Sequence, residues 1–343
     1  MSKMLAEIRE QPAALQRTLK SAARRIREFS RAVELQKPRL VVLAARGTSD
    51  NAALFGRYLI EMTTGLPVSL AAPSIQTLYG ATVEYRNALV IGVSQSGESP
   101  DVNVVVAKAR EGGALTLGIT NEPHSALAQT AEHVLLVGAG KERSVAATKT
   151  YTGQVMVLYL VAKSLGAALK TSDLEAIPGL ADAALRLEGE VNELAGRFRF
   201  MNRAVVVGRG LNYANAFEMA LKLMETCYVA AERFSSADFL HGPIAMVDPN
   251  FPVFAFGPAG PGWPGLEETL LRLRGMKTET VVITDKRNRE APGQVIRIPV
   301  SVPEIYSPIP YIIPAQIFAA ALAREKGLDP DKPRSLNKVT RTL

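Results

Sequence analysis

Short apolar runs alternate with amphipathic stretches along most of this chain. Runs rich in Val and Leu occupy 40–45 and 88–93, and each is followed by a stretch with helical periodicity, at 51–64 and 100–111. A third apolar run follows at 114–120. Strands buried on both faces have continuous apolar sequences, and strands that alternate with helices are typical of βαβ units. The pattern therefore predicts an α/β fold with a parallel sheet flanked by helices.

The second half of the chain repeats this order. Apolar runs at 204–207, 253–256 and 280–284 enclose helical stretches at about 215–224 and 266–274. Gly47 and Gly210 are 163 positions apart, Gly97 and Gly260 are also 163 apart, and Ile119 and Ile283 are 164 apart. A nearly constant offset indicates an internal duplication. We expect two tandem doubly wound subdomains of the flavodoxin-like kind.

The remaining patterns divide the chain into three parts. Residues 1–36 are predicted to form one or two amphipathic N-terminal helices, ahead of a first subdomain at 37–180 and a second at 181–343. The linker at about 145–197 is mostly helical in pattern, and Ile177-Pro178-Gly179 is its strongest break. We place the boundary around Ile177–Asp182.

The composition and charge argue against several classes of protein, although they do not identify the function. The 343 residues are 47% hydrophobic and 21% charged, which suits a globular core. Cys227 is the only cysteine, and His124, His133 and His241 lack a ligand spacing, so we expect no metal site. The net charge of +7 is scattered, and the basic cluster between Arg17 and Arg31 is typical of a solvated helix face. We expect a soluble, cytoplasmic protein with neither a nucleic-acid nor a membrane partner, because the apolar runs are too short to cross a bilayer.

The loop after the second apolar run has the composition of an anion site. Open α/β sheets bind ligands beyond the carboxyl ends of their strands. Ser94, Ser96 and Ser99 lie there, and Pro100 suits the first position of a helix whose free N–H groups would face an anion. Neither of the Gly-rich nucleotide motifs is present, so the loop fits a single monoester phosphate or is simply a capped helix with a serine-rich turn. The matching loop at 257–262 has no hydroxyl groups, and we expect it to have lost anion binding.

Three charged residues share one face of a helix that is otherwise apolar. Glu218, Lys222 and Glu225 have the spacing i, i+4 and i+7. They are either a salt-bridge ladder or a general acid–base set. His241 lies between turn-forming residues, and Lys338 lies in a polar C-terminal segment; each fits a structural or a catalytic role.

Taken together, these segments resemble the double-domain members of the sugar isomerase (SIS) family, and especially the isomerase half of glucosamine-6-phosphate synthase. The resemblance covers about residues 35–343. It rests on Gly47-Thr48-Ser49, Ser94–Ser99, Val145–Lys149, Ala220–Glu225, His241-Gly242-Pro243 and Lys332–Lys338.

The resemblance implies a role for each candidate residue. Glu225 would move a proton between C1 and C2 of the sugar, supported by Glu218 and Lys222. His241 would help to open the ring, reaching in from the second subunit of a homodimer, and Lys338 would contact the open-chain sugar. The chemistry implies no metal and no other cofactor. Residues implied to bind the phosphate are Thr48, Ser49, Ser94, Gln95, Ser96 and Ser99, and those implied to line the sugar are Gly47, Val145 and Ala147.

The chain also departs from the synthase pattern. We expect no glutaminase domain, and in this respect the chain resembles the stand-alone SIS-type glucosamine-6-phosphate deaminases. Ala147 stands where the synthases have a hydroxyl residue, and Asn337 replaces a small residue before Lys338. We expect an aminosugar-phosphate isomerase that releases ammonia.

Two alternatives remain open. The protein could be an isomerase or deglycase for another aminosugar phosphate, which would share the phosphate loop and differ in the contacts to the ring. It could also be a non-catalytic sugar-phosphate-binding regulator, a possibility that only the basic helix at 17–31 favours.

Overall fold

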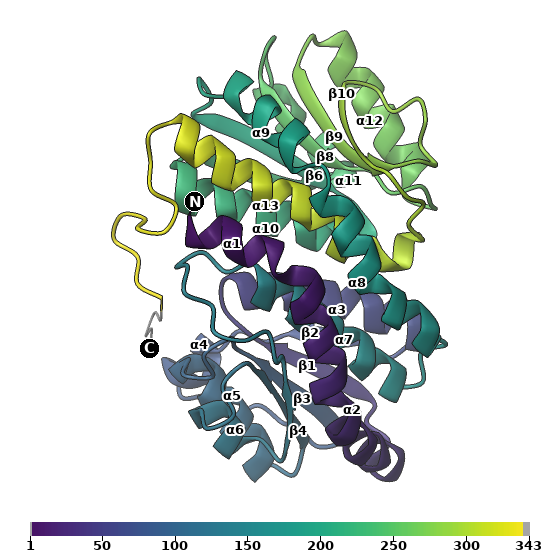
Figure 1. Cartoon of the computed structure of the whole chain (residues 1–343). Helices are drawn as coiled ribbons and strands as arrows, with labels where there is room; N and C mark the ends of the chain where they lie inside the picture. Colours follow the sequence, from purple (N-terminus) through teal and green to yellow (C-terminus); the bar gives the residue numbers. More distant parts are fainter. Residues whose placement is uncertain (1, 339–343) are drawn as a thin grey trace. The chain divides into compact units, whose positions relative to one another are not determined.

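The computed structural model describes residues 2–338, which fold into two compact units, each built on a five-stranded parallel sheet (Figure 1). The first-sheet unit consists of 13–142, 149–175 and 337–338. The second-sheet unit consists of 2–12, 143–148 and 176–336. Neither unit is continuous in sequence, because residues 2–12 and 143–148 belong to the second-sheet unit and residues 337–338 belong to the first-sheet unit.

The first sheet has the strand order β2-β1-β3-β4-β5. Its strands pair in parallel, with Val42 opposite Val90 and Ile91 opposite Leu117. The strands are β1 (Leu40–Ala44), β2 (Val68–Leu70), β3 (Ala88–Val93), β4 (Leu115–Thr120) and β5 (His133–Leu136). The helices are α2 (Gln11–Gln36), α3 (Thr48–Thr64), α4 (Ser74–Thr77), α5 (Pro100–Glu111), α6 (Ala126–Thr130) and α7 (Lys149–Ser164).

Both faces of this sheet are covered, which explains why its strands are apolar throughout. Val102 and Val106 of α5 and Leu127 of α6 form one core cluster with Val90. On the other face α3 packs against α7. Gly92 allows α5 and α6 to pack closely against β3, because a Cβ atom on this residue would lie 2.8 Å from side-chain atoms of both helices.

The second sheet repeats the first with the strand order β10-β9-β8-β6-β7, so each strand has a counterpart in the same place. Its strands are β6 (Arg203–Gly208), β7 (Ala230–Ser235), β8 (Pro252–Phe256), β9 (Glu279–Asp285) and β10 (Gln294–Ile298). Its helices are α1 (Lys3–Arg9), α8 (Thr171–Leu185, which starts in the first-sheet unit), α9 (Glu188–Arg197), α10 (Tyr213–Cys227), α11 (Ser236–Leu240), α12 (Trp263–Gly275) and α13 (Pro308–Glu325), with 3₁₀ turns at Gly210–Asn212, Pro243–Met246 and Glu304–Tyr306.

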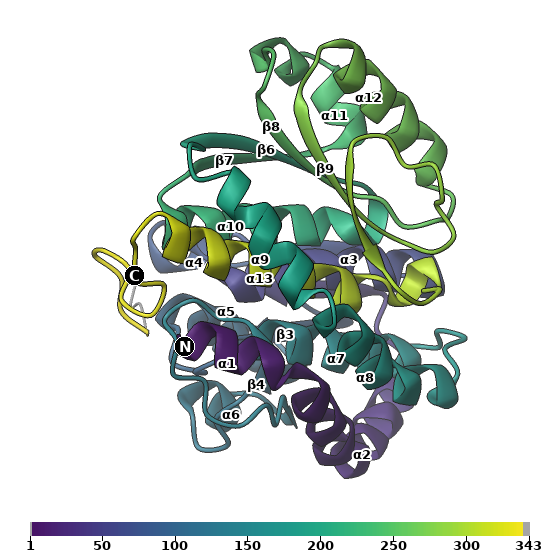
Figure 2. The same cartoon turned by 45° about the horizontal axis from the view of Figure 1, so that its top comes forward.

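Helices cover both faces of the second sheet as well (Figures 1 and 2). α13 lies against α9 and α10, where Phe318 packs edge-on against Phe198 and Phe254. On the opposite face, Leu266 and Leu270 of α12 join the strands in a second core cluster. Each fully buried side chain of this size contributes roughly 1.5–3 kcal/mol.

The structure confirms the α/β fold with two parallel sheets, N-terminal helices and an internal repeat. The repeat extends to backbone detail: Gly47 after β1 and Gly210 after β6 have φ values of +57° and +56°. The subdomain boundaries at 36 and 180 stay predictions.

One local expectation is wrong. α8 continues through Pro178, although we expected the linker to break there. Leu174, Ile177 and Ala181 of α8 are buried, and this packing outweighs the hydrogen bond that a proline removes.

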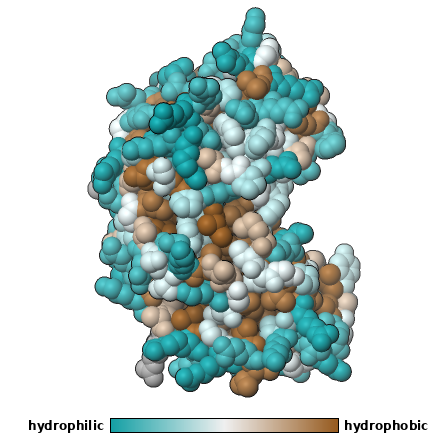
Figure 3. Space-filling view, turned by 90° about the vertical axis from the view of Figure 1, so that its right-hand side faces the viewer, coloured by the Kyte–Doolittle hydropathy of each residue, from teal (hydrophilic) through white to brown (hydrophobic). Residues whose placement is uncertain are grey.

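The surface is mixed in character. On the face shown in Figure 3, hydrophilic residues cover much of the molecule and hydrophobic residues show between them. Within residues 2–338, no helix is long and apolar enough to cross a membrane.

Candidate active site

The loops after β1 and β3 form the predicted phosphate cradle, which lies within the first-sheet unit. β1 and β3 are neighbours in the sheet. The chain passes from β1 to β2 on one side of β1, and from β2 it crosses to β3 on the other side. This is the switch point at which doubly wound sheets bind ligands. α3 begins directly after β1 and α5 directly after β3, so the N-termini of two helices meet this crevice.

Gly47 shapes the first loop of the cradle. Its φ of +57° and ψ of −133° lie in a region that side chains disfavour, and its carbonyl accepts from the N–H groups of Asp50 and Asn51. Thr48 and Ser49 follow as the first residues of α3. The Ser49 hydroxyl is buried and accepts a hydrogen bond of 2.9 Å from Gln154 Nε2, which fixes it against α7.

Serine hydroxyls build the second loop. Ser94 Oγ accepts from Gly97 N at 3.1 Å, and Ser96 Oγ accepts from Glu98 N at 3.2 Å. Gly97 has a φ of +66°, and a Cβ atom there would lie 2.1 Å from Ser125 Oγ. A hydroxyl that accepts through its oxygen still has a proton to donate. Ser94 and Ser96 can therefore hold the loop and also donate to an anion.

Ser99 does not cap α5 in the way its sequence predicts. It is the N-cap residue, and its carbonyl accepts from Asn103 N, but its side chain makes no capping hydrogen bond. Its ψ of 112° is lower than that of Ser125 and Ser235, the two serines whose hydroxyls cap α6 and α11. The Ser99 hydroxyl is therefore not committed to the helix end.

Arg46 connects the two loops, a feature that the sequence analysis missed. Its guanidinium donates through Nε (2.9 Å) and Nη2 (2.6 Å) to Oδ2 of Asp101, in the first turn of α5. The Asp101 side chain is 3% exposed and that of Arg46 is 49% exposed. Burial raises the pKa of Asp50 in the adjoining turn, and the charge of Arg46 opposes this rise. The cradle thus has an arginine beside its hydroxyl groups.

The charged face predicted on α10 is present in the second-sheet unit. Lys222 Nζ lies 2.5 Å from Glu225 Oε2 and 3.5 Å from Glu218 Oε1. The side chains of Lys222 and Glu218 are fully buried, whereas that of Glu225 is 23% exposed. The ladder therefore ends in one carboxylate that solvent or a ligand can reach.

His241 lies in the same unit, just beyond α11. It is the C-cap residue of that helix, its N–H donates to Asp238 O at 3.1 Å, and the residue is exposed. Gly242, with a φ of +140°, turns the chain immediately after it. The imidazole is on the surface of its unit and is not part of a core.

Lys338 is an ion-pair partner within the first-sheet unit. Its Nζ lies 2.9 Å from Oε2 of Glu142, a carboxylate with no exposed surface. Glu142 also accepts from the N–H (3.1 Å) and the hydroxyl (2.6 Å) of Thr150. Glu142 was not among the predicted site residues, because an isolated glutamate in a polar loop carries no local signal.

Val145 and Ala147, predicted to line the sugar, lie in the part of the second-sheet unit that follows Glu142. The segment is fixed at both ends, since Ser144 N donates to Glu7 Oε2 at 3.1 Å and Thr148 O accepts from Gln316 Nε2 at 3.4 Å. Both residues are partly exposed. The part of the chain that the structure describes holds no cluster of three or more side chains suited to a metal ion.

Comparison with known proteins identifies relatives along nearly the whole chain. The SIS domain matches twice, at residues 34–164 and 198–324. The glutamine–fructose-6-phosphate aminotransferase of Methanothermobacter thermautotrophicus is 35% identical over 98% of this chain, and that of Gloeobacter violaceus is 36% identical over 98%. These matches cover 56% and 58% of the two relatives, so the chain spans little more than half their length.

Solved structures agree with the sequence matches. The C-terminal domain of glucosamine-fructose-6-phosphate aminotransferase from Francisella tularensis superposes with a TM-score of 0.88 at 28% identity, covering 97% of this chain and 98% of that domain. A glucosamine-6-phosphate deaminase from Thermotoga maritima covers 99% of this chain and 100% of its own, with a TM-score of 0.74 at 24% identity. The second match shows a shared fold.

Proposed function

Since the chain belongs to the SIS domain family, with two copies of the domain, we propose that it is a phosphosugar isomerase acting on an aminosugar 6-phosphate. The reaction that we propose converts glucosamine 6-phosphate and water to fructose 6-phosphate and ammonia. The relatives named above act on sugar 6-phosphates according to their names. We propose the same class of substrate, a sugar 6-phosphate, for this chain.

The charged face of α10 is the observation that supports the proposal most strongly. Here a fully buried ammonium and a fully buried carboxylate, Lys222 and Glu218, support Glu225, whose side chain is 23% exposed. A carboxylate held in one orientation and open to a ligand suits a general base that must meet a carbon-bound proton.

We propose that the cradle binds the 6-phosphate. Thr48, Ser94, Gln95, Ser96 and Ser99 would donate hydroxyl or backbone N–H groups to its oxygens, together with the N-termini of α3 and α5. The Ser49 hydroxyl, which accepts from Gln154, would contribute its proton or its backbone N–H. The hydroxyl groups and Arg46 suit a monoester, which carries two negative charges at neutral pH.

The chemistry would proceed through the open-chain sugar. His241 would assist ring opening by moving a proton between the ring oxygen and O1. Glu225 would then take the proton from C2 and return it to C1, which converts the 2-amino aldose to the ketimine. Water adds to the ketimine and ammonia leaves, which gives the ketose. Lys338 would contact the open-chain sugar near the reacting carbons, and Gly47, Val145 and Ala147 would line the sugar.

A coupled assay tests this function. Purified protein should release ammonia and fructose 6-phosphate in equal amounts from glucosamine 6-phosphate, and neither product from unphosphorylated glucosamine. Galactosamine 6-phosphate and fructose adducts of amino acids should be assayed in parallel, because a preference for one of them would indicate the related isomerase or deglycase activity. Failure to turn over any aminosugar or ketose phosphate would contradict the enzymatic proposal and favour a sugar-phosphate sensor.

We also propose that the protein is a cytoplasmic homodimer, with the active site near the subunit interface. His241 is exposed on its own unit, as a residue that serves a neighbouring subunit must be. Mixing two inactive variants, Glu225→Gln and His241→Ala, would then restore part of the activity through mixed dimers. No recovery after exchange of subunits would contradict a shared site.

A further inference from the structure

The second sheet has a crevice that corresponds to the phosphate cradle of the first. β6 and β8 occupy the places of β1 and β3, and the loops that follow them carry Gly210 and Gly260 at the constant offset of 163 from Gly47 and Gly97. α12 begins after the second of these loops, at Trp263. The repeat therefore keeps the glycine positions and the following helix of an anion site, although the loop at 257–262 has no hydroxyl groups.

The carboxylate of Glu304 lies in this crevice. A Cβ atom on Gly260 would be 1.7 Å from Glu304 Oε2 and 2.7 Å from its carboxyl carbon. Cβ atoms on Gly262 and Gly210 would lie 3.6 Å and 4.0 Å from Glu304 Oε1. Three glycines from the two loops thus lie around one carboxylate, which takes the space that a side chain at position 260 would need.

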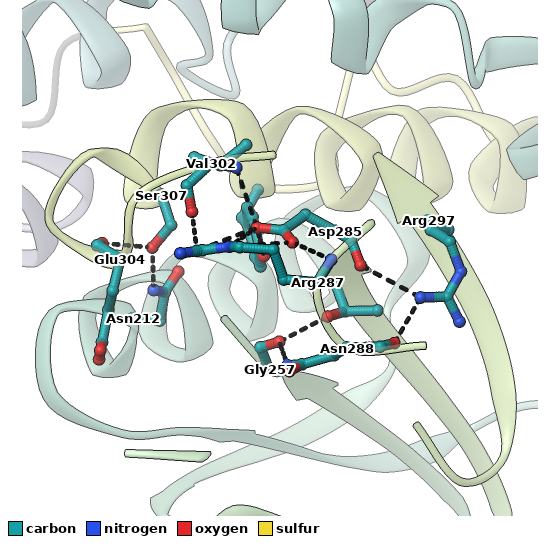
Figure 4. A network of polar contacts seen from close by, with 11 residues as sticks. Asn212, Gly257, Asp285, Arg287, Asn288, Arg297, Val302, Glu304 and Ser307 are labelled. Carbon is teal, nitrogen blue, oxygen red and sulfur yellow. Dashed lines mark hydrogen bonds and ion pairs between the residues drawn. The ribbon is translucent and has the colours of Figure 1, made fainter. Parts of the chain in front are cut away.

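The backbone near Glu304 is anchored to the same crevice (Figure 4). Glu304 begins the 3₁₀ turn that leads into α13, and its carbonyl accepts from Ser307 Oγ at 2.7 Å. Asn212, in the loop after β6, donates from Nδ2 to the same Ser307 Oγ at 2.7 Å. The segment that supplies the carboxylate is therefore held by the loop that the carboxylate contacts.

Two arginines, Arg287 and Arg209, lie close to this crevice. Arg287 is held by an ion pair of 3.2 Å with the buried Asp285 and donates to the Val302 carbonyl, near the turn that bears Glu304 (Figure 4). Burial raises the pKa of Glu304, and the charge of Arg287 opposes this rise. Arg209 follows β6 as Arg46 follows β1, and its Cβ lies 3.9 Å from the place that a Cβ atom on Gly262 would take.

We propose that Glu304 is an internal anion that occupies the second crevice in place of a phosphate monoester, so that only the first-sheet unit is open to phosphorylated ligands. The crevice has the elements of a phosphate site: a glycine-rich loop, a helix N-terminus and arginine side chains. Its occupant is a carboxylate of the chain itself. In this view the second half did not lose its anion site by losing hydroxyl groups, as its sequence suggests, but filled it.

Removing Glu304 should open the crevice to inorganic phosphate. Glu304→Ala is expected to bind one more phosphate ion per chain than the natural protein, measured by isothermal titration calorimetry or by phosphorus NMR. Glu290→Ala, which removes an exposed carboxylate of the same unit, should leave the number unchanged. The added site should disappear again in Glu304→Ala combined with Arg209→Ala.

The readout is a difference between variants, so it does not depend on the enzymatic proposal. If the cradle of the first sheet binds no phosphate, the natural protein would bind none and Glu304→Ala would bind one. Glu304→Ser also takes the carboxylate out of the crevice, and it replaces the alanine variant if that variant does not fold; it should gain the same site. An unchanged number of bound phosphate ions in every folded Glu304 variant would overturn the proposal.

Discussion

At the scale of single residues, charged side chains that are fully buried should have a large effect on the free energy of unfolding. Lys222 and Glu218 are fully buried, and removal of one partner from a buried pair leaves a desolvated charge whose compensation has been lost. Exposed pairs are worth much less, because water and salt screen them. The structure holds both kinds within the described residues, which allows a direct comparison.

We expect Lys222→Met to lower the free energy of unfolding by about 3–5 kcal/mol, measured by urea denaturation, because Glu218 and Glu225 lose their buried ammonium. The matched change Arg186→Met removes a cation from an exposed pair with Asp182, whose side chains are 71% and 57% exposed. It should cost less than about 1 kcal/mol. Equal losses in the two variants would show that the α10 ladder does not stabilise the protein through burial.

The ion pair between Arg9 and Glu188 should make the stability of the protein depend on pH. Hydrogen bonds from the Arg9 guanidinium lower the pKa of Glu188. A lowered pKa in the folded state means that the stabilisation is complete above the unfolded pKa of about 4.3 and is lost as the pH falls through the folded value.

Glu188→Gln should therefore reduce the melting temperature slightly at pH 7, by the equivalent of about 0.5 kcal/mol for a partly exposed pair. The difference from the natural protein should close as the pH falls below about 4. A difference that persisted at low pH would mean that the glutamate contributes through packing, not charge.

Some residues of the site could be predicted from the sequence and others could not. Glu218, Lys222 and Glu225 could be predicted because helical spacing places them on one face. Arg46, Glu142 and Glu304 could not, because each acts through a partner far away in sequence or through backbone that only the fold assembles. Such contacts leave no periodic pattern.

At the scale of elements, left-handed backbone positions decide where the loops turn. A Cβ atom on Gly47 would have no other atom within 4 Å, so a side chain there is opposed by backbone strain alone. Its φ and ψ lie in a region that costs about 1–3 kcal/mol for other residues.

We expect Gly47→Ala to destabilise the protein by about 1–3 kcal/mol and to weaken phosphate binding at the cradle, because it distorts the first turn of α3. Gly179→Ala is the control. Gly179 is exposed in α8 with no atom near the place of a Cβ, so alanine should stabilise the helix by about 0.5–1 kcal/mol. Thermal melts and a phosphate titration measure both effects. An alanine at 47 that is tolerated as well as one at 179 would show that the turn does not need a glycine.

The central strands were easier to predict than the edge strands. β1, β3 and β4 are buried over nearly their whole length and therefore appear in the sequence as apolar runs. β2 has only three residues, and β7 and β10 are partly exposed, so their sequences lack that signal. Helix boundaries are also hard to predict from sequence, because tertiary packing can outweigh a local helix breaker, as it does at Pro178.

At the scale of the whole molecule, duplication explains how one fold supplies two different sets of residues. The two sheets share their strand order, and both loops after the first strand of each half turn at a glycine, with φ values of +57° and +56°. The first half has kept serine hydroxyl groups at its crevice, whereas the second carries the α10 carboxylates and fills its crevice with Glu304. The constant offset of 163 made the repeat predictable, but the difference in chemistry depends on side chains that a backbone repeat does not specify.

The most direct test of the proposed catalysis compares turnover and binding in Glu225→Gln, with Glu232→Gln as an exposed control in the same unit. The glutamine variant should form no measurable fructose 6-phosphate from glucosamine 6-phosphate, yet bind glucitol 6-phosphate with an affinity within a few fold of the natural protein, while the control keeps full activity. Turnover that survives in Glu225→Gln would contradict the role of this carboxylate as the proton carrier.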